Sequence, residues 1–386
     1  MFLSPFHVDF DITLACTHKC LHCNVSAGKR LDDELSFEEI CSIIDEFEQI
    51  GVCHISFTGG EPLLRSDCVN ILEYAASKNS FKLVLNTNGL LLTREFIKRI
   101  SKFKDDILIA ISMDGYDCKT YSNLRKTDEL GTPTSESQFN RIIENIQMLI
   151  AENIRVTINY TITKLTIGNF YETFEKMNSI GIKGMLGIKF FPFGQGDRYK
   201  DILELDYNVW KDFLIELIRK KMSDDKYKGI KISVPSPWEL YLPLLEYGYS
   251  KEVISKIFQY NSPLETKVYR RNRDIGCHAG VTSCAISPNG DVYPCGTVSS
   301  NYPDFIAGNL RKTTMADIWK NSTKLKDFRS IELSLIEGNC GECKISYLCG
   351  GGCRARAYFK TKSLLSADYL CPKNQTKGGS YENIDN

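Results

Sequence analysis

The chain has 386 residues, of which 48 are basic, 48 are acidic and 15 are cysteine, and its formal net charge is zero. A neutral chain lacks the bulk positive field that attracts nucleic acid or an anionic membrane, so we expect neither partner. No run approaches the roughly 18 uninterrupted apolar residues of a membrane span, and no secretory segment is recognisable near Met1, so we expect a cytoplasmic protein.

The first two hundred residues alternate between β-rich and helical patterns. Ser36 and Glu39 form the signature of a helix capping box, and apolar residues at helical spacing follow them. Alternating strands and helices predict an α/β fold with a parallel sheet, helices outside it and ligands at the carboxyl ends of the strands. The predicted strands cover residues 8–14, 54–57, 82–85, 107–111, 155–162 and 185–190, and the helices cover 36–47, 69–76, 95–100, 139–151 and 170–177.

The pattern changes after Phe193. Residues 206–222 predict another amphipathic helix, and the proline-containing stretch 230–275 is interpreted as a connector. From about Gly276 there are few long periodic segments, so metal clusters would have to stabilise a thin core, and a loose polar tail begins near Lys377. We therefore expect four parts, at residues 1–200, 201–275, 276–377 and 378–386.

The cysteines fall into two groups. Cys16, Cys20 and Cys23 are spaced C-x3-C-x2-C directly after the first predicted strand. Three thiolates from one short loop can hold three irons of a cubane cluster and leave the fourth iron open to a reacting molecule. The second group occupies the last third of the chain and comprises Cys277, Cys284, Cys295, Cys340, Cys343, Cys349, Cys353 and Cys371.

Disulfide bonds are the alternative explanation for so many cysteines. Disulfide-rich proteins are short secreted domains that lack an adequate core, whereas this chain is long enough to bury one. In a reducing cytoplasm, clustered cysteines are more often metal ligands or catalytic groups. The sequence therefore favours metal clusters over crosslinks.

Three motifs together resemble the radical S-adenosylmethionine (SAM) superfamily: the Cys16–Cys23 loop, Gly59-Gly60-Glu61-Pro62 after the second strand, and Ser112-Met113-Asp114-Gly115 after the fourth. The resemblance covers roughly residues 8–195 and implies a partial (β/α)6 TIM-like barrel. It implies that Cys16, Cys20 and Cys23 hold a [4Fe–4S] cluster whose open iron binds SAM. Reductive cleavage of SAM would then give a 5′-deoxyadenosyl radical that abstracts hydrogen from a substrate.

The resemblance also implies the residues that contact SAM. Gly59 and Gly60 would let the backbone approach the methionine ammonium, because neither residue has a Cβ. Glu61 would fix nearby polar groups, and Pro62 would stiffen the turn. Ser112 and Arg125 would contact the ribose or the methionine carboxylate, and Asn159 would contact the ribose. His22 would pack on adenine, and the loop 191–196 would also lie near adenine.

The second cysteine group is similar to the seven-cysteine SPASM domain, which binds two auxiliary [4Fe–4S] clusters in enzymes that mature peptides and proteins. Gly308-Asn309-Leu310 and a helix with Ile318, Trp319 and Phe328 also resemble that family. The resemblance implies three [4Fe–4S] clusters in all. A zinc ribbon is the competing interpretation, but zinc would leave most of these thiols unexplained unless two sites formed.

The family's connectivity assigns each auxiliary cluster its ligands. The first cluster would take Cys277, Cys295 and Cys353, with Cys284 as a fourth ligand if it binds, and the second would take Cys340, Cys343, Cys349 and Cys371. Two saturated clusters favour electron transfer over direct binding of substrate. The other four cysteines, Cys41, Cys53, Cys68 and Cys118, are interpreted as buried structural residues.

The sequence defines the substrate less well than it defines the fold and the cofactors. Our main expectation from the resemblance is an oxidoreductase that abstracts hydrogen from a ribosomally made peptide and leaves an oxidation or a C–C or C–S crosslink. A flavodoxin- or ferredoxin-type protein would supply electrons. Because the barrel begins within ten residues of Met1, either a separate leader-binding protein presents the peptide, or the barrel face and residues 206–275 recognise it.

Several alternatives stay open. Anaerobic sulfatase maturation is disfavoured, because relatives with that activity have an aspartate base where this chain has Gly296. Ser26-Ala27-Gly28-Lys29 resembles a segment of haem-pathway enzymes, so modification of a tetrapyrrole side chain by the same radical chemistry is the second hypothesis. A non-catalytic electron-transfer module is the third, although a carrier has no need of the Gly59-Gly60-Glu61 motif.

Overall fold

The computed structural model describes residues 2–262, 273–300 and 302–375, so the predicted tail near Lys377 lies outside the described residues. Two compact units divide the chain. The barrel unit comprises Phe2–Glu204 and Ala279–Lys326, and the cysteine-rich unit comprises Leu205–His278 and the chain from Asp327 onward. These units cut across the predicted boundaries, because Ser283–Ile286 forms a strand that pairs with the first strand of the barrel.

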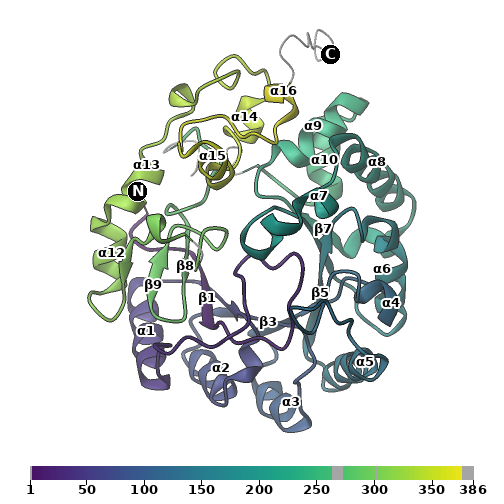
Figure 1. Ribbon diagram of the computed structural model, residues 1–386, viewed down its shortest axis with the longest axis vertical. Helices are drawn as coiled ribbons and strands as arrows, with labels where there is room; N and C mark the ends of the chain where they lie inside the picture. The colour runs from purple at the N-terminus through teal and green to yellow at the C-terminus, as the bar shows by residue number, and fades with distance from the viewer. Residues whose placement is uncertain (1, 263–272, 301, 376–386) are drawn as a thin grey trace. The chain divides into compact units, whose positions relative to one another are not determined.

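The barrel unit is built on one sheet with strand order β10-β9-β8-β1-β2-β3-β4-β5-β6. Strands β1 to β6 run parallel with helices outside them, as the sequence predicts (Figure 1). Strand β8 joins the other side of β1 in parallel, with Val8 opposite Cys284. The barrel strands are β1 His7–Thr13, β2 His54–Gly59, β3 Lys82–Thr87, β4 Ile107–Ser112, β5 Arg155–Ile162 and β6 Met185–Lys189, and the added strands are β8 Ser283–Ile286, β9 Asp291–Tyr293 and β10 Gly308–Asn309.

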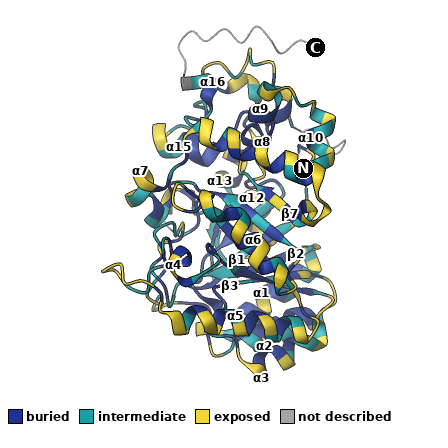
Figure 2. Cartoon of the chain, turned by 90° about the vertical axis from the view of Figure 1, so that its right-hand side faces the viewer, coloured by how far each residue is buried: buried dark blue, intermediate teal, exposed yellow. Residues whose placement is uncertain are grey.

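The helices of the barrel unit follow the predicted pattern. Helix α1 begins after Ser36, whose side chain accepts from the backbone of Glu39 while the Glu39 side chain accepts from the backbone of Ser36. The apolar stripe of α1 is buried, and the outward faces of α2, α3 and α5 are exposed (Figure 2). The helices are α1 Phe37–Ile50, α2 Cys68–Ser77, α3 Arg94–Ile100, α4 Cys118–Tyr121, α5 Glu136–Ala151, α6 Phe170–Ser179, α7 Lys200–Leu203 and α12 Met315–Asn321.

Strand β1 has one apolar and one polar face. Phe10 is fully buried, and its ring centroid lies 6.4 Å from that of Phe47 on α1. Because successive side chains point to opposite faces of a strand, Asp9, Asp11 and Thr13 lie on the face away from the helices. The barrel interior is therefore polar along β1, and this strand delivers the chain into the three-cysteine loop.

The cysteine-rich unit contains more regular structure than the sequence indicated. The predicted helix at 206–222 is confirmed as α8 Tyr207–Ser223, but the expected connector forms β7 Ile230–Ser233, α9 Trp238–Tyr247 and α10 Lys251–Phe258. Pro243 lies inside α9, where it cannot donate to the carbonyl of Glu239. The indole of Trp210 donates to that carbonyl instead, at 2.6 Å, so tertiary packing overrides the proline signal.

The last third of the chain contributes short helices. The predicted helix with Ile318, Trp319 and Phe328 is two helices that break at Ser322, namely α12 and α13 Thr323–Arg329. Three more follow in the cysteine-rich unit, α14 Ser346–Cys349, α15 Arg354–Thr361 and α16 Pro372–Gln375. Among the described residues, no helix has the length and apolarity to span a membrane.

Candidate functional site

The three-cysteine loop is held at the carboxyl end of β1 by backbone hydrogen bonds. Cys16 donates to the carbonyl of Gly28 at 3.1 Å, and Leu21 donates to that of Leu124 at 2.9 Å. Arg65, which is buried, donates to the carbonyls of Ile12 and Leu35 on either side of the loop. The loop is therefore fixed before any ligand binds.

Each thiol of this loop is matched by a nitrogen donor. Burial raises the pKa of Cys16 to about 11 and that of Cys20 to about 12, so a free thiolate would be costly here. The amides of His18 and Ala27 point at the sulfurs of Cys16 and Cys23, both at 3.4 Å, and Arg125 Nη1 lies 3.8 Å from Cys20 Sγ. Such donors suit thiolates bound to a positively charged cluster core.

The two glycines of the second motif are packed against the three-cysteine loop. A Cβ on Gly60 would lie 2.2 Å from the carbonyl oxygen of Ala15, and one on Gly59 would lie 2.3 Å from that of Thr13. The amides of Gly60 and Glu61 donate to these same carbonyls, both at 2.7 Å. The glycines therefore let the turn and the loop approach each other, a requirement that exists without SAM.

Replacing Gly60 by alanine is expected to destabilise the protein by about 1–3 kcal/mol and to lower the iron bound by the three-cysteine loop, because the new methyl group collides with backbone. Gly168→Ala is the matched control, since no atom lies within 4 Å of its added Cβ. Urea unfolding and iron analysis of both variants check this prediction. Equal stability and iron content in the two variants would contradict it.

Glu61 is committed to the protein framework. Its carboxylate is fully buried and accepts from the Thr87 hydroxyl at 2.7 Å and from the amides of Asn88 and Leu63 at 2.8 and 3.1 Å. Burial raises its pKa, and these donors oppose that shift. Glu61 thus joins the ends of β2 and β3, and the buried Pro62 begins a short turn after it.

Asp114, which follows β4, and Arg125, which follows α4, form a buried ion pair. Arg125 Nε lies 2.7 Å from Asp114 Oδ2, and the other carboxylate oxygen of Asp114 accepts from the amide of Thr161 at 2.6 Å. His22 Nε2 lies 3.9 Å from Asp114 Oδ2. The pair links the third motif to Cys20 through Arg125.

Four buried polar atoms of the candidate site have no hydrogen-bond partner among the described residues. They are His18 Nε2, His22 Nδ1, Tyr121 Oη and Asn159 Oδ1. Asn159 lies opposite Ser112 in the sheet and donates to Asn86 at 3.0 Å. Buried polar atoms are nearly always hydrogen-bonded in folded proteins. A polar ligand with several donors and acceptors, such as SAM, fits these atoms.

The loop after β6 lies against the third cysteine, and its expected place near adenine stays a prediction. The amide of Gly196 donates to the carbonyl of Cys23 at 3.3 Å, and a Cβ on Gly194 would lie 2.2 Å from the carbonyl oxygen of Asn24. The sequence motif therefore marks a contact with the cysteine loop.

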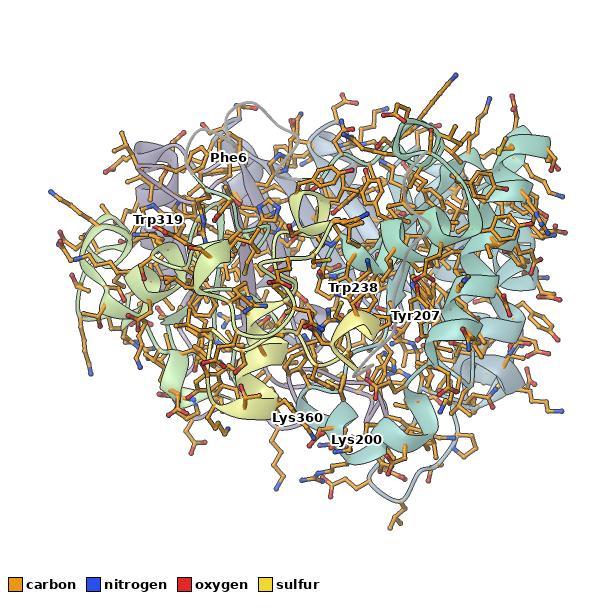
Figure 3. All side chains as sticks on the ribbon, turned by 90° about the horizontal axis from the view of Figure 1, so that it is seen from above. Phe6, Lys200, Tyr207, Trp238, Trp319 and Lys360 are labelled. Carbon is orange, nitrogen blue, oxygen red and sulfur yellow. The ribbon has the colours of Figure 1, made fainter. Side chains whose placement is uncertain are left out.

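Four cysteines of the second group line one pocket in the cysteine-rich unit: Cys340, Cys343, Cys349 and Cys371, with Trp238 beside them. Trp238 belongs to an apolar cluster that also includes Tyr207, and Figure 3 labels both side chains. Burial raises the pKa of Cys349 to about 12, which again disfavours free thiolates. Four thiols around one apolar pocket fit the ligand set of a cubane cluster.

The remaining candidate ligands are divided between the two units. Cys277 and Cys353 belong to the cysteine-rich unit, and the Cys353 amide donates to Asp368 Oδ2 at 2.9 Å. Cys284 is fully buried on β8 in the barrel unit, and Cys295 follows β9 in the same unit.

The positions of the cysteines also bear on disulfide bonds and on a single-metal site, the alternatives to iron–sulfur clusters. All 15 cysteines lie in the described ranges, and none forms a disulfide. Among those residues, no group of three or more His, Cys, Asp or Glu side chains is arranged to hold a single metal ion. Of the four cysteines outside the motifs, Cys41, Cys68 and Cys118 are buried as expected, whereas Cys53 is only half-buried.

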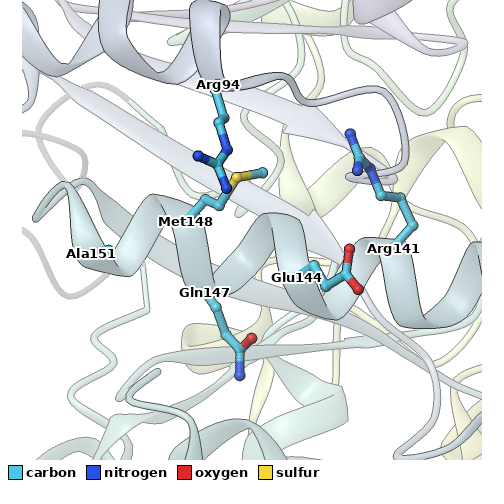
Figure 4. A pocket seen from close by; sticks show the side chains of 6 residues that line it. All are labelled: Arg94, Arg141, Glu144, Gln147, Met148 and Ala151. Carbon is cyan, nitrogen blue, oxygen red and sulfur yellow. The ribbon is translucent and has the colours of Figure 1, made fainter.

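A separate hollow lies on the outer surface of the barrel unit, between α3 and α5. Arg94, Arg141, Glu144 and Met148 line it, together with Gln147 and Ala151 (Figure 4). None of the predicted ligands lines this hollow, so it is not part of the candidate site.

Sequence reasoning missed several residues of the site. Asp114 lies inside the third motif but was given no role, and its pairing with Arg125 becomes evident only when the segment after α4 folds back onto the end of β4. Asn88, which donates to Thr17 at 2.9 Å, was not assigned a role in the site from the sequence. The unpartnered ring nitrogen of His18 had no signal beyond its place between two cysteines.

Comparisons with known proteins agree with this site. Residues 10–177 match the model of the radical SAM superfamily, and residues 277–344 match an iron–sulfur cluster-binding domain, SPASM. The chain is 29% identical to the AdoMet-dependent heme synthase of Methanosarcina barkeri, over 95% of this chain and 96% of that one. It is 26% identical to the mycofactocin maturase MftC of Mycobacterium tuberculosis, over 97% of this chain and 84% of that one.

The fold also matches that of Streptococcus suis SuiB, solved with its precursor peptide SuiA, with a TM-score of 0.72 and 18% identity over 96% of this chain and 76% of SuiB. The three-cysteine loop at the end of β1, the glycine turn against it and the cysteine pocket all agree with the two family matches. The chain therefore belongs to the radical SAM superfamily and is a radical SAM enzyme with a C-terminal SPASM domain.

Proposed function

We propose that this enzyme abstracts a hydrogen atom from a side chain of a tetrapyrrole in the formation of haem or a related pigment. The observation that carries this proposal is the match to the heme synthase, which spans nearly the full length of both chains. The match to the mycofactocin maturase leaves more of that protein uncovered. The ordering of the relatives thus supports our second hypothesis over the peptide substrate that we first expected.

The chain's own residues bind and orient the reactants in this proposal. Cys16, Cys20 and Cys23 would hold the open cluster. Ser112 and Asn159 on β4 and β5, with Arg125 after α4, would hold SAM. The bound cofactor supplies the hydrogen-abstracting radical, and an external flavodoxin- or ferredoxin-type reductant supplies the electron that generates it. The buried pair Asp114–Arg125 keeps the guanidinium aligned with the cysteine loop.

After hydrogen abstraction, the substrate radical must lose one electron to give a closed-shell product. Abstraction of hydrogen leaves an unpaired electron on the side-chain carbon, and loss of that electron together with a proton or another leaving group restores a closed shell. An auxiliary cluster, if bound, would supply the acceptor for this electron. We assign Cys277, Cys295 and Cys353, with Cys284 as a candidate fourth ligand, to the first auxiliary cluster, and the four pocket cysteines to the second.

The surroundings of Gly296 bear on sulfatase maturation, the activity that the sequence disfavours. A Cβ on Gly296 would lie 2.9 Å from Asp9 Oδ2, so an aspartate at this position would bring two carboxylates together. This contact supports the view that the chain does not mature sulfatases by means of a base at position 296. Peptide modification remains the second candidate function, because peptide maturases such as the subtilosin protein AlbA of Bacillus subtilis are also similar, at 24% identity.

The test offers tetrapyrroles and peptides to the same enzyme under anaerobic, reducing conditions. Tetrapyrroles with carboxylate side chains, with and without iron, are compared with short peptides recovered by pull-down. We expect a tetrapyrrole to stimulate formation of 5′-deoxyadenosine and to change in mass, with Cys20→Ala as the inactive background. Stimulation and mass change with a peptide alone would contradict the proposal and favour peptide maturation.

A further inference from the structure

Asp11 lies on the interior face of the barrel sheet. Its partner on β2 is Thr58. The registers of β2 to β5 place Asn86, Ser112 and Asn159 on this same face. These neighbours are half-buried, whereas the exposed fraction of Asp11 is only 3%. The barrel interior therefore contains a carboxyl group that bulk water scarcely reaches.

The described part of the chain supplies no cation to this carboxyl group. Ser299 and Ser300 donate to Asp11 Oδ2, each at 3.4 Å, and Oδ1 accepts no hydrogen bond from the described residues. The histidine on the same strand, His7, pairs with Asp9 at 3.0 Å instead. A buried carboxylate is costly unless a cation or strong hydrogen bonds compensate its charge. Asp11 thus lacks the partner that its ionised form requires.

The groups around Asp11 disfavour its ionised form. Burial, together with the charge of Asp9, raises the pKa of Asp11 to about 7, and the two serine hydroxyls oppose this shift. Tyr293 on β9 also interacts with the charge of Asp11. The neighbouring strands β2 and β8 present the uncharged Thr58 and Ala285 to this face. A bound cation would favour the ionised form.

Asp11 also adjoins the glycine turn that packs against the three-cysteine loop. A Cβ on Gly59 would lie 3.2 Å from Asp11 Cβ. The carboxyl group is therefore next to the turn and the loop that the radical SAM match includes. SAM carries two cationic groups, an ammonium and a sulfonium, so it has the charge that this part of the barrel lacks.

We propose that Asp11 is a cofactor-contacting residue whose carboxylate compensates a cationic group of bound SAM, either the ammonium or the sulfonium. Asp11 releases its proton to water when SAM binds, so that a carboxylate faces the cation. The inference rests on the proposed assignment of SAM to this end of the barrel. It holds equally for a tetrapyrrole and for a peptide substrate, because the substrate takes no part in it.

Equilibrium binding of SAM to the reconstituted enzyme, with the cluster oxidised so that SAM is not cleaved, tests the proposal. Because ionised Asp11 attracts the cation, the wild-type affinity should rise as the pH increases from acidic values to about 7. Asp11→Asn should bind SAM about tenfold more weakly at neutral pH and should lose this rise. Asp105→Asn removes an exposed acid of the same unit and should behave as the wild type does. Equal affinity and pH dependence in Asp11→Asn and the wild type would overturn the proposal.

Two analogues of SAM identify the cationic group. S-Adenosylhomocysteine keeps the ammonium but has a neutral sulfur, and 5′-methylthioadenosine has neither charge. Weaker binding of both SAM and S-adenosylhomocysteine to Asp11→Asn would assign the ammonium, and weaker binding of SAM alone would assign the sulfonium. An equal loss of affinity for 5′-methylthioadenosine would overturn the proposal, because it would show a general distortion of the site.

A calorimetric measurement leaves position 11 intact, in case Asp11→Asn does not fold. Binding of SAM to the wild-type enzyme near neutral pH should release protons, seen as a heat that depends on the ionisation enthalpy of the buffer. Binding without proton release would overturn the role of Asp11. A wild-type enzyme that is loaded with iron but binds no SAM would instead contradict the assignment of SAM to this end of the barrel.

Discussion

Replacing Cys20 by alanine is expected to abolish formation of 5′-deoxyadenosine and to lower the iron content from about twelve atoms to about eight, because one of the three proposed cubane clusters would be lost. The Cys20 sulfur is buried, and Arg125 is directed at it. A cubane held by two thiolates has no replacement ligand in this loop, since no other cysteine lies between Cys16 and Cys23. Iron analysis and a dithionite-driven assay with SAM measure both effects.

Cys53→Ala is the matched control for this variant. Cys53 is a half-buried cysteine of the same unit, outside every motif, and its sulfur lies 3.7 Å from the carbonyl oxygen of Gly51. This variant should keep both the iron content and the turnover of SAM. Formation of 5′-deoxyadenosine by Cys20→Ala at the rate of Cys53→Ala would exclude the radical mechanism at this loop.

The second large effect concerns the buried ion pair of Asp114 and Arg125. Arg125→Met is expected to destabilise the protein by about 3–5 kcal/mol, because it leaves the Asp114 carboxylate buried without a cation. The exposed fractions of the two side chains are only 7% and 0%, so water cannot replace the lost partner. Urea unfolding of the variant measures the loss, and SAM binding should weaken with it.

Two further variants separate the charge from the packing. Arg125→Met combined with Asp114→Asn leaves no unpaired charge and should recover much of the stability. Arg311→Met removes an exposed pair with Glu39, in which the side chains are 33% and 37% exposed, and should change stability by no more than about 1 kcal/mol. Equal losses of stability in Arg125→Met and Arg311→Met would show that burial of the Asp114–Arg125 pair does not determine how much its loss destabilises the protein.

The sequence predicts the local features of the barrel well, because each rests on a few neighbouring residues. The capping box at Ser36 and the period of two in β1 are set within about one turn or strand. The glycine turn at Gly59 was recognised too, although the structure gives it a further cause in the carbonyls of Thr13 and Ala15.

Features that depend on distant partners could not be predicted in this way. Pro243 signals a connector until Trp210, far away in the sequence, supplies the missing donor to Glu239. The compact units cut across the predicted domain boundaries, because pairing of β8 with β1 joins residues about 275 positions apart.

The central claim is that the chain carries an open cluster that cleaves SAM and two auxiliary clusters. Iron and sulfide analysis of anaerobically reconstituted wild-type protein, paired with a dithionite-driven assay for 5′-deoxyadenosine, tests it most directly. The account predicts about twelve irons per chain together with turnover of SAM. Zinc in place of the auxiliary iron, or a fully loaded protein that forms no 5′-deoxyadenosine, would contradict it.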